Sequence, residues 1–204
     1  PFYAYFLAGV YKIFGHDYII PRLIQHLIGS LSCVLVYQLG KRLFNRQVAI
    51  ISGLLAAAYG MFWYYEDELL LDSFLVFFDL VLIWLLLRAR EKPKFTSWLL
   101  AGVVLGFSAI TRPNILFFVP FVWLWMFLVF RNIRSFKDIT VYCAAFLIGG
   151  ILIISPVALR NLLVGKDLVL IASQGGINFY IGNNKNSDGM SAIFYKEDWQ
   201  YRDF

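Results

Sequence analysis

The feature that most constrains this chain is a series of long apolar runs separated by short polar segments. Six runs, near residues 19–40, 47–65, 69–87, 96–111, 114–130 and 139–159, stand out. They match or approach the ~20 residues that a helix needs to cross a hydrocarbon core about 30 Å thick. Because the separators are short, neighbouring runs are expected to form antiparallel hairpins. The sequence therefore predicts an all-α polytopic membrane protein with six spans.

Composition supports this fold class. The chain has 204 residues, of which 60% are hydrophobic and only 15% charged, and its mean hydropathy is +0.69. A soluble domain is nearer 45–50% apolar and about 25% charged, so too little polar surface is present to cover a water-soluble globule. Cytosolic enzymes, secreted disulfide scaffolds and disordered regions are thereby excluded. The two cysteines, Cys33 and Cys143, lie in apolar runs and are expected to be free thiols.

Basic residues are concentrated in alternate loops. Three loops on one side of the predicted bundle hold ten of the 18 basic residues, namely Lys41, Arg42, Arg46, Arg88, Arg90, Lys92, Lys94, Arg131, Arg134 and Lys137. Loops of this kind face the cytoplasm, so the other loops are expected to be extracytoplasmic. Because the positive charge is a topology signal and not one patch, no nucleic-acid partner is predicted.

The organisation along the chain has three parts. Residues 1–17 are expected to form an interfacial helix, Phe2 to Phe14, ended by Gly15, and an outer loop. Residues 18–160 form the predicted bundle. Residues 161–204 are expected to start an extracytoplasmic segment, with a strand at 167–172 and a turn-rich stretch at 175–184. Since the chain begins with Pro1 and not Met, we expect a fragment of a longer protein.

Acidic residues mark the outer end of the second hairpin. Glu66, Glu68 and Asp72 surround the start of the third span, and on a helix Glu68 and Asp72 share a face. They predict an acidic site for a cation, a proton or sugar hydroxyls. The alternative for Glu66 and Asp67 is capping of that helix's N-terminus. Asp79, deeper on the same stripe, is either functional or hydrogen-bonded between helices. No standard metal-ligand spacing is present, so no metal site is predicted and divalent metal use stays open.

Arginines and asparagines occupy the same predicted face. Each arginine has a phosphate-binding interpretation and a structural one. Arg22 binds a lipid phosphate or snorkels. Arg112 binds headgroups or pairs with the acids near Asp72. Arg160 contacts phosphate or satisfies a helix C-terminus. In the turn-rich stretch, amides suited to sugar hydroxyls are carried by Asn178, Asn183 and Asn184. His26 is expected to bond a neighbouring helix, and we expect Asp72 and Arg22 to face one cavity.

Several short motifs follow one another in a characteristic order. They are Pro1-Phe2-Tyr3 with Tyr11 to Gly15, Pro21-Arg22-Leu23, Val36 to Phe44, Tyr65 to Asp72, Gly106 to Pro113, and Gly175-Gly176 through Gly182-Asn183-Asn184. With these motifs the chain resembles bacterial members of the dolichyl-phosphate-mannose–protein mannosyltransferase family, including the lipid A aminoarabinose transferases, within the glycosyltransferase C superfamily. The resemblance covers nearly the whole chain, although the region from Arg160 to Asn184 departs from the aminoarabinose transferases.

The resemblance implies a multi-pass enzyme of the bacterial inner membrane. Such enzymes transfer a sugar from a polyprenyl-phosphate carrier to a protein, lipid or glycan acceptor on the extracytoplasmic face. It implies that Asp72 is the second acidic residue of the active-site cavity and Arg22 the arginine near the start of the second transmembrane helix. The family's main catalytic carboxylate is then expected upstream of residue 1. Two other classes stay open, a transporter or flippase and a noncatalytic membrane scaffold.

Overall fold

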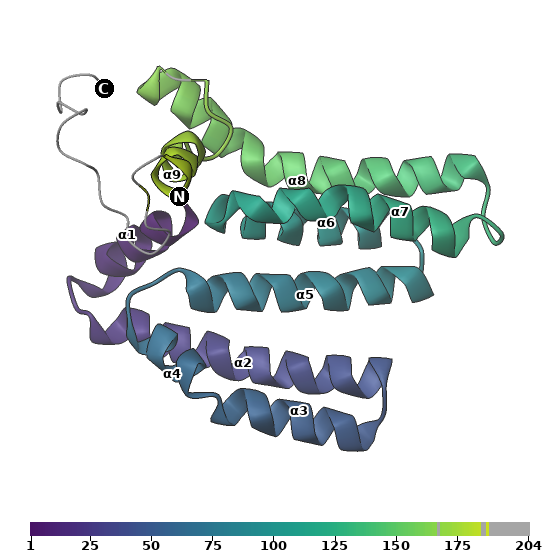
Figure 1. Cartoon of the computed structure of the whole chain (residues 1–204), viewed down its shortest axis with the longest axis horizontal. Helices are drawn as coiled ribbons and strands as arrows, with labels where there is room; N and C mark the ends of the chain where they lie inside the picture. The colour runs from purple at the N-terminus through teal and green to yellow at the C-terminus, as the bar shows by residue number, and fades with distance from the viewer. Residues whose placement is uncertain (167, 185–186, 188–204) are drawn as a thin grey trace. The chain divides into compact units, whose positions relative to one another are not determined.

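The structure, a computed structural model, describes residues 1–166, 168–184 and 187. Two compact units are distinguished, Pro1–Ile171 and Ala172–Phe204, and each is described by itself. Within the described residues every regular element is helical (Figure 1). The elements of the first unit are α1 (Phe2–Phe14), α2 (Ile19–Leu43), α3 (Arg46–Ala58), α4 (Gly60–Asp67), α5 (Asp72–Glu91), α6 (Phe95–Thr111), the 3-10 helix η1 (Pro113–Phe118), α7 (Val119–Phe130) and α8 (Phe136–Gly165). The second unit contains α9 (Gln174–Asn183).

Helix α1 confirms the helix predicted at residues 2–14. It ends at Gly15, whose φ of 82° lies in the left-handed region that favours glycine. Its first residue, Phe2, places its ring centroid 5.2 Å from that of Phe74 and 5.2 Å from that of Phe78. These edge-to-face contacts fix the start of α1 against α5.

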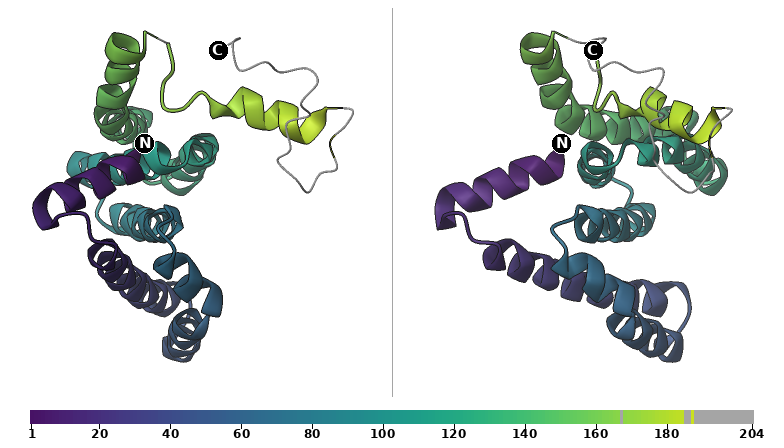
Figure 2. Two further views of the ribbon diagram at one scale, coloured as in Figure 1. Left: turned by 90° about the vertical axis from the view of Figure 1, so that its left-hand side faces the viewer. Right: turned by 60° about the vertical axis from the view of Figure 1, so that its left-hand side comes forward.

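Helix α5 is central in the first unit. It packs between the α2–α3 hairpin on one side and α6 on the other, as Figure 2 shows in views along the helices. The buried apolar core lies on the α6 side, where α5, α6, α7 and α8 meet. Its fully buried large side chains are Leu82, Trp98, Leu105, Met126 and Phe146.

Small residues allow α6 and α8 to pack with their backbones in contact. A Cβ atom added to Gly149 would lie 2.7 Å from the backbone nitrogen of Val103, and closer still to the carbonyl oxygen of Leu99. A Cβ atom on Gly102 would meet the backbone of Phe146 in the same way. Gly102 and Gly106 form a G-x-x-x-G pattern, which is typical of close helix contacts in membranes. The close packing of α6 and α8 therefore requires glycine, which has no side chain, at these positions.

Each of the six apolar runs contains helix, but not all of these helices are long enough for a simple span. Three candidates are long and apolar enough, Ile19–Leu43, Pro113–Phe130 and Phe136–Gly165. The pair α3 and α4 makes a fourth if it is one broken span, bent by 47° around Tyr59. Helix α6 has 17 residues, a length of about 26 Å. The chain is thus an integral membrane protein with three or four candidate spans among its described residues, and six stays a prediction.

Two predictions about the segment after α8 are wrong. No strand forms at residues 168–172, where Asn161 Nδ2 donates to the carbonyl oxygens of Val169 at 3.0 Å and Ile171 at 3.4 Å. A strand needs a partner for its backbone, and the described residues supply a side chain instead. The stretch predicted to be turn-rich is helical from Gln174 to Asn183. Residues 161–165 of the predicted extracytoplasmic segment belong to α8, and residues 167, 185–186 and 188–204 lie outside the described residues.

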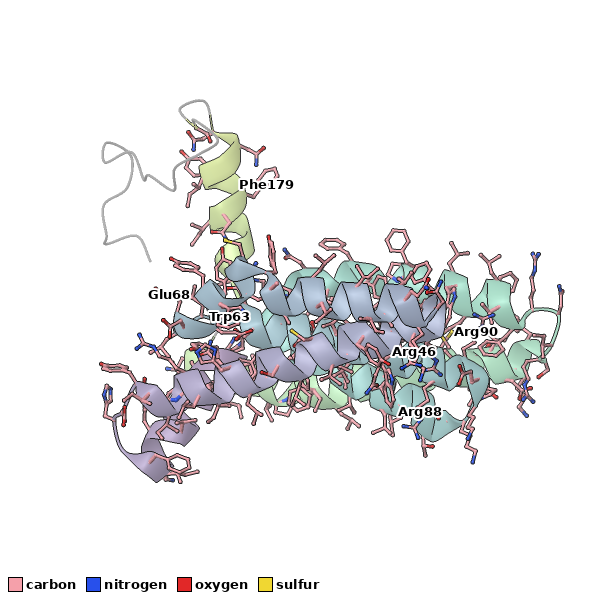
Figure 3. The ribbon with its side chains drawn as sticks, turned by 90° about the horizontal axis from the view of Figure 1, so that it is seen from below. Arg46, Trp63, Glu68, Arg88, Arg90 and Phe179 are labelled. Carbon is pink, nitrogen blue, oxygen red and sulfur yellow. The ribbon has the colours of Figure 1, made fainter. Side chains whose placement is uncertain are left out.

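The ends of α2 and α5 that carry the basic residues are joined by an ion pair. Arg42 Nε donates a hydrogen bond of 2.9 Å to Glu91 Oε1. Figure 3 shows Arg46, Arg88 and Arg90 gathered at this same end of the helices. We call it the basic end of the first unit.

Acidification is expected to weaken the Arg42–Glu91 pair. Glu91 lies beyond the predicted span 69–87, and the hydrogen bond from Arg42 lowers the pKa of its carboxyl. The pKa of a glutamate in the unfolded chain is near 4.3, and the pKa of Glu91 in the folded protein is lower. The pair therefore stabilises the fold fully at pH values above the unfolded pKa. Its contribution is lost as the pH falls through the lowered pKa. Thermal unfolding from about pH 7 to pH 3 should show wild type and Glu91→Gln converging in acid. A constant gap between the two curves would contradict this.

Candidate functional site

Polar side chains meet at the end of the first unit opposite to the basic end. Figure 3 shows Glu68 and Trp63 at this end, far along the helices from Arg46 and Arg88. The residues come from the start of α2, from α4, from the start of α5 and from the end of α6. Their placement follows from the antiparallel order of the helices, which returns the chain to this end after α3 and after α6.

The four residues 68–71 join α4 to α5, and we call them the connector. Helix α4 ends at Asp67 and α5 begins at Asp72. The prediction that Glu68 and Asp72 share a helical face is therefore wrong. The carbonyl oxygens of Glu68 and Leu70 each accept a hydrogen bond of 3.1 Å from Gln25 Nε2, and the chain does not continue as a helix. The side chain of Glu68 is exposed.

The carboxylate of Glu66 rests against α2 at a glycine. A Cβ atom added to Gly29 would lie 2.8 Å from Glu66 Oε2 and closer to Oε1, so the carboxylate fills the space of a missing side chain. His26 Nδ1 lies 2.9 Å from Glu66 Oε2, and the side chain of Glu66 is only 12% exposed. His26 thus bonds a neighbouring helix, as predicted. Capping of the third span by Glu66 is contradicted, because Glu66 lies in the last turn of α4.

Arg22 contacts the end of α4. Its Nε donates a hydrogen bond of 2.8 Å to the carbonyl oxygen of Asp67 and lies 3.9 Å from Asp67 Oδ1. Asp67 therefore does not cap α5 either. The side chain of Arg22 is 44% exposed, so its guanidinium also borders solvent or headgroups. Two cationic or protonatable groups of α2, Arg22 and His26, thus lie against the acidic end of α4.

Asp72 pairs with the cation at the end of α6. Arg112 Nη2 lies 2.9 Å from Asp72 Oδ1, with 51% of the arginine side chain and 26% of the aspartate side chain exposed. This is one of the two interpretations that the sequence left open for Arg112. Deeper along α5, Ser108 Oγ donates a hydrogen bond of 2.6 Å to Asp79 Oδ1. Asp79 therefore has the interhelical hydrogen bond of its structural interpretation.

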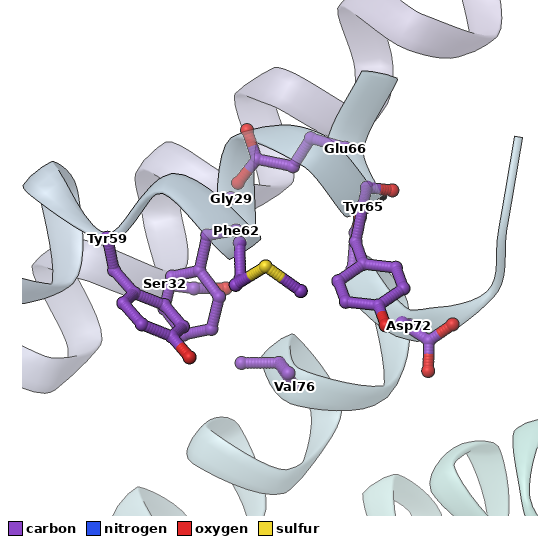
Figure 4. A pocket seen from close by; sticks show the side chains of 10 residues that line it. Gly29, Ser32, Tyr59, Phe62, Tyr65, Glu66, Asp72 and Val76 are labelled. Atoms are coloured by element: carbon purple, nitrogen blue, oxygen red, sulfur yellow. Dashed lines mark hydrogen bonds between the residues drawn. The ribbon is translucent and has the colours of Figure 1, made fainter. Parts of the chain in front are cut away.

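A cavity of about 240 Å³ opens between α2, α4 and α5 (Figure 4). Two carboxylates, those of Glu66 and Asp72, belong to its wall, and no lysine or arginine does. Aromatic and hydroxyl groups supply much of the remaining wall, namely Tyr59, Phe62, Tyr65, Ser32 and Ser73. Arg22 is not among the residues that line this cavity, so a cavity shared by Asp72 and Arg22 stays a prediction. A second cavity of about 570 Å³ shares Glu66 with the first and is also lined by His26, Cys33 and Trp63.

Of the other predicted site residues, Arg160 of the first unit does not line the cavity that contains Glu66 and Asp72. Arg160 is exposed near the end of α8. Asn178 is exposed on α9, in the second unit. Asn183 Nδ2 donates a hydrogen bond of 2.9 Å to the carbonyl oxygen of Phe179 in its own helix. Among the residues described, no group of three or more His, Cys, Asp or Glu side chains is placed to hold a metal ion.

Sequence reasoning missed Gln25, which is fully buried and touches four segments of the site. The available signal was its spacing. Gln25 follows Arg22 by three residues and precedes Gly29 by four, so all three share one face of α2. An amide on the same helical face as a charged residue and a glycine indicates a face packed against polar backbone, not lipid.

Comparison with known proteins identifies the family of this chain. The family described as dolichyl-phosphate-mannose-protein mannosyltransferase matches residues 1–159. No curated protein and no solved structure matches the chain. The matched region contains α1 to α7 and most of α8, and so the whole cluster from Arg22 to Arg112. The chain therefore belongs to the dolichyl-phosphate-mannose-protein mannosyltransferase family, a family of membrane glycosyltransferases that use a polyprenyl-phosphate sugar as donor.

Proposed function

We propose that this protein transfers a sugar from a polyprenyl-phosphate carrier to an acceptor on the extracytoplasmic face of the bacterial inner membrane. The observation that supports this most is the cavity bounded by Glu66 and Asp72 at the end of the helices opposite to the basic end. Basic loops face the cytoplasm. The cavity then opens at the other face, where the donor's head reaches it while the prenyl chain stays in the bilayer.

The cavity wall suits a sugar ring. Carboxylates accept hydrogen bonds from hydroxyl groups, and tyrosine hydroxyls both donate and accept. Aromatic faces such as those of Phe62 and Tyr59 provide an apolar surface for the C–H face of a sugar. A volume of about 240 Å³ is of the size of one monosaccharide and much smaller than a prenyl chain. We therefore assign the cavity to the transferred sugar.

The proposed reaction is displacement at the anomeric carbon. The acceptor's oxygen forms a bond to that carbon, the bond to the phosphate oxygen breaks, and the phosphate leaves with the electron pair. The acceptor's proton passes to a carboxylate. The family resemblance places the main catalytic carboxylate upstream of residue 1, and within this chain we assign Asp72 to act on the reacting groups as the second carboxylate. Arg112, paired with the cavity residue Asp72, and Arg22, bonded to Asp67, have partly exposed side chains and would stabilise the negative charge of the phosphate.

The other site residues have less direct parts in this proposal. Glu66 binds hydroxyls of the sugar. Glu68, exposed on the connector, stays a predicted second catalytic carboxylate. For Arg160, Asn178 and Asn183, contacts with substrate stay predictions, as do the identity of the sugar, of the acceptor (protein, lipid or glycan) and of any divalent metal.

Replacing Glu66 by glutamine is expected to lower sugar transfer about tenfold. Glutamine keeps the size of the side chain but removes the negative charge, which makes the carboxylate oxygens strong hydrogen-bond acceptors. The matched control is Glu91→Gln, the same change at a glutamate that pairs with the other end of α2. Transfer is measured in membranes containing the protein, with radiolabelled polyprenyl-phosphate sugars and a panel of acceptors.

Equal transfer by Glu66→Gln and Glu91→Gln would remove Glu66 from the site but leave the enzyme. Absence of transfer by wild-type membranes across the whole panel, with the protein present and inserted, would overturn the proposed function. Expression and insertion are checked for every variant by quantitative blotting of the membrane fraction.

A further inference from the structure

We infer that Gln25 is a positioning residue, whose buried side-chain amide holds the connector and so fixes the place of Asp72 in the site. The inference rests on the proposed function for the role of Asp72, but its geometric part stands on hydrogen bonds within the first unit. It goes beyond the charged residues of the cavity, because Gln25 is not among the cavity-lining residues.

The amide of Gln25 is fully buried, with 0% of the residue exposed. Its Nε2 donates to the carbonyl oxygens of Glu68 and Leu70, each at 3.1 Å. Two longer contacts of 3.5 Å reach the carbonyl oxygen of Tyr65 and the hydroxyl of Ser73. One side chain of α2 therefore contacts the end of α4, two residues of the connector, and the start of α5.

The surroundings fix the orientation of this amide. Three of the groups facing Nε2 are backbone carbonyl oxygens, which only accept hydrogen bonds. The NH₂ group must therefore face the connector, and Oε1 must face the other way. Oε1 accepts a hydrogen bond of 2.9 Å from the hydroxyl of Tyr3 on α1. Burial, with a smaller effect of Tyr11, raises the pKa of Tyr3 to about 12, so at neutral pH the hydroxyl keeps its proton and donates.

The connector is followed directly by Asp72, the carboxylate that we assign to the reaction. Leu71 is the N-cap of α5, and its carbonyl oxygen accepts a hydrogen bond of 3.1 Å from the backbone nitrogen of Leu75. Asp72 is the first residue of the helix. Ser73 Oγ donates at 3.3 Å to the carbonyl oxygen of Tyr65, which links the start of α5 to α4. A shift of Glu68 and Leu70 would therefore move Asp72 away from Arg112 and from the cavity.

Removing the amide is expected to loosen the connector. In Gln25→Leu, the carbonyl oxygens of Glu68 and Leu70 and the hydroxyl of Tyr3 lose a partner in partly buried surroundings. In Gln25→Glu, the side chain keeps an oxygen that accepts from Tyr3, and a protonated carboxyl would donate to one carbonyl, so part of the effect should be rescued. The matched control is Gln38→Leu, the same change at an exposed glutamine of α2.

Two measurements test the inference on the detergent-solubilised protein. The first is hydrogen–deuterium exchange of the peptide covering residues 68–72, which needs no enzyme activity. We expect exchange in Gln25→Leu to be faster by about tenfold, while α8 keeps its wild-type exchange. The second is steady-state transfer, in which kcat should fall about tenfold because a misplaced catalytic group slows the chemical step. The KM for the donor should change less than about threefold.

The outcomes separate the inference from the proposed function. Faster exchange of the connector with lower kcat, in the order wild type, Gln25→Glu, Gln25→Leu, supports the inference. Wild-type exchange of the connector in Gln25→Leu overturns it, whatever the activity. Faster exchange with an unchanged kcat also overturns it, since the connector would then not position Asp72 for catalysis. If wild type shows no transfer, the proposed function fails, and exchange alone decides whether Gln25 holds the connector.

Discussion

Replacing Gly149 by alanine is expected to lower the free energy of unfolding by about 2 kcal/mol or more, because the new methyl group has no room. It would lie 2.7 Å from the backbone nitrogen of Val103 and closer to the carbonyl oxygen of Leu99. Both are backbone atoms of α6, so relief requires the two helices to separate. Separation would open the contact between α6 and α8 beside the core residues Trp98 and Phe146.

The neighbouring residue provides the matched control for this prediction. A Cβ atom on Gly150 would meet its nearest atoms, the carbonyl oxygen of Gly102 and Leu105 Cδ2, at 3.6 and 3.7 Å, which is ordinary contact. Gly150→Ala should therefore be neutral or stabilise the helix by up to about 1 kcal/mol. Unfolding of the two variants is followed in detergent by circular dichroism against temperature. Equal unfolding of Gly149→Ala and Gly150→Ala would contradict the close contact between α6 and α8.

Replacing Asp72 by asparagine is expected to reduce sugar transfer at least about 100-fold, the usual minimum for loss of a general acid or base. The substitution keeps the size of the side chain but replaces one acceptor oxygen by an NH₂ donor. It therefore removes a proton acceptor and the negative charge beside Arg112, 2.9 Å away. Since the lost interaction acts on the reacting groups, kcat should fall more than the affinity for the donor changes.

The control for Asp72→Asn is Asp138→Asn, the same change in the first turn of α8. Asp138 follows Lys137 in that turn and does not line the cavity, so its replacement should leave transfer unchanged. Transfer per inserted protein is compared for both variants with radiolabelled donor in membranes. Transfer by Asp72→Asn within about twofold of wild type would remove Asp72 from the reaction, since general acid–base catalysis contributes far more.

The positions of the helices were predictable because hydropathy reports burial in lipid or protein directly. All six apolar runs contain helix, and the terminator of α1 at Gly15 was visible as a glycine. The break at Tyr59 between α3 and α4 was not predicted, because the residues around it are apolar and hydropathy does not register a 47° bend. The number of spans depends on that bend and on helix length, which composition does not give.

In the site, too, the features set by local sequence and topology were predictable, and those set by contacts with distant residues were not. Placement of Asp72 and Arg112 at one end followed from topology, and their pairing was one of two stated alternatives. The sequence from Glu68 to Leu71 looks helical, yet the chain is broken there while Gln25, more than 40 residues earlier, binds two of its carbonyl oxygens. Tertiary hydrogen bonds of this kind override local propensity and leave no mark in the segment itself.

The polar face of α2 has a consequence for how the protein is made. The NH₂ group of Gln25 and the ring of His26 find their partners on α4, the connector and α5, between 40 and 48 residues later in the chain. At about 5–20 residues per second, the ribosome needs roughly 2–8 seconds to supply the first of those partners. During that interval α2 carries an amide NH₂ group and an imidazole whose partners have not yet been synthesised, although Tyr3, the partner of Gln25 Oε1, already has been. Stable insertion of α2 therefore depends on segments translated after it, and the helix reaches its final place only when α4 and α5 have emerged.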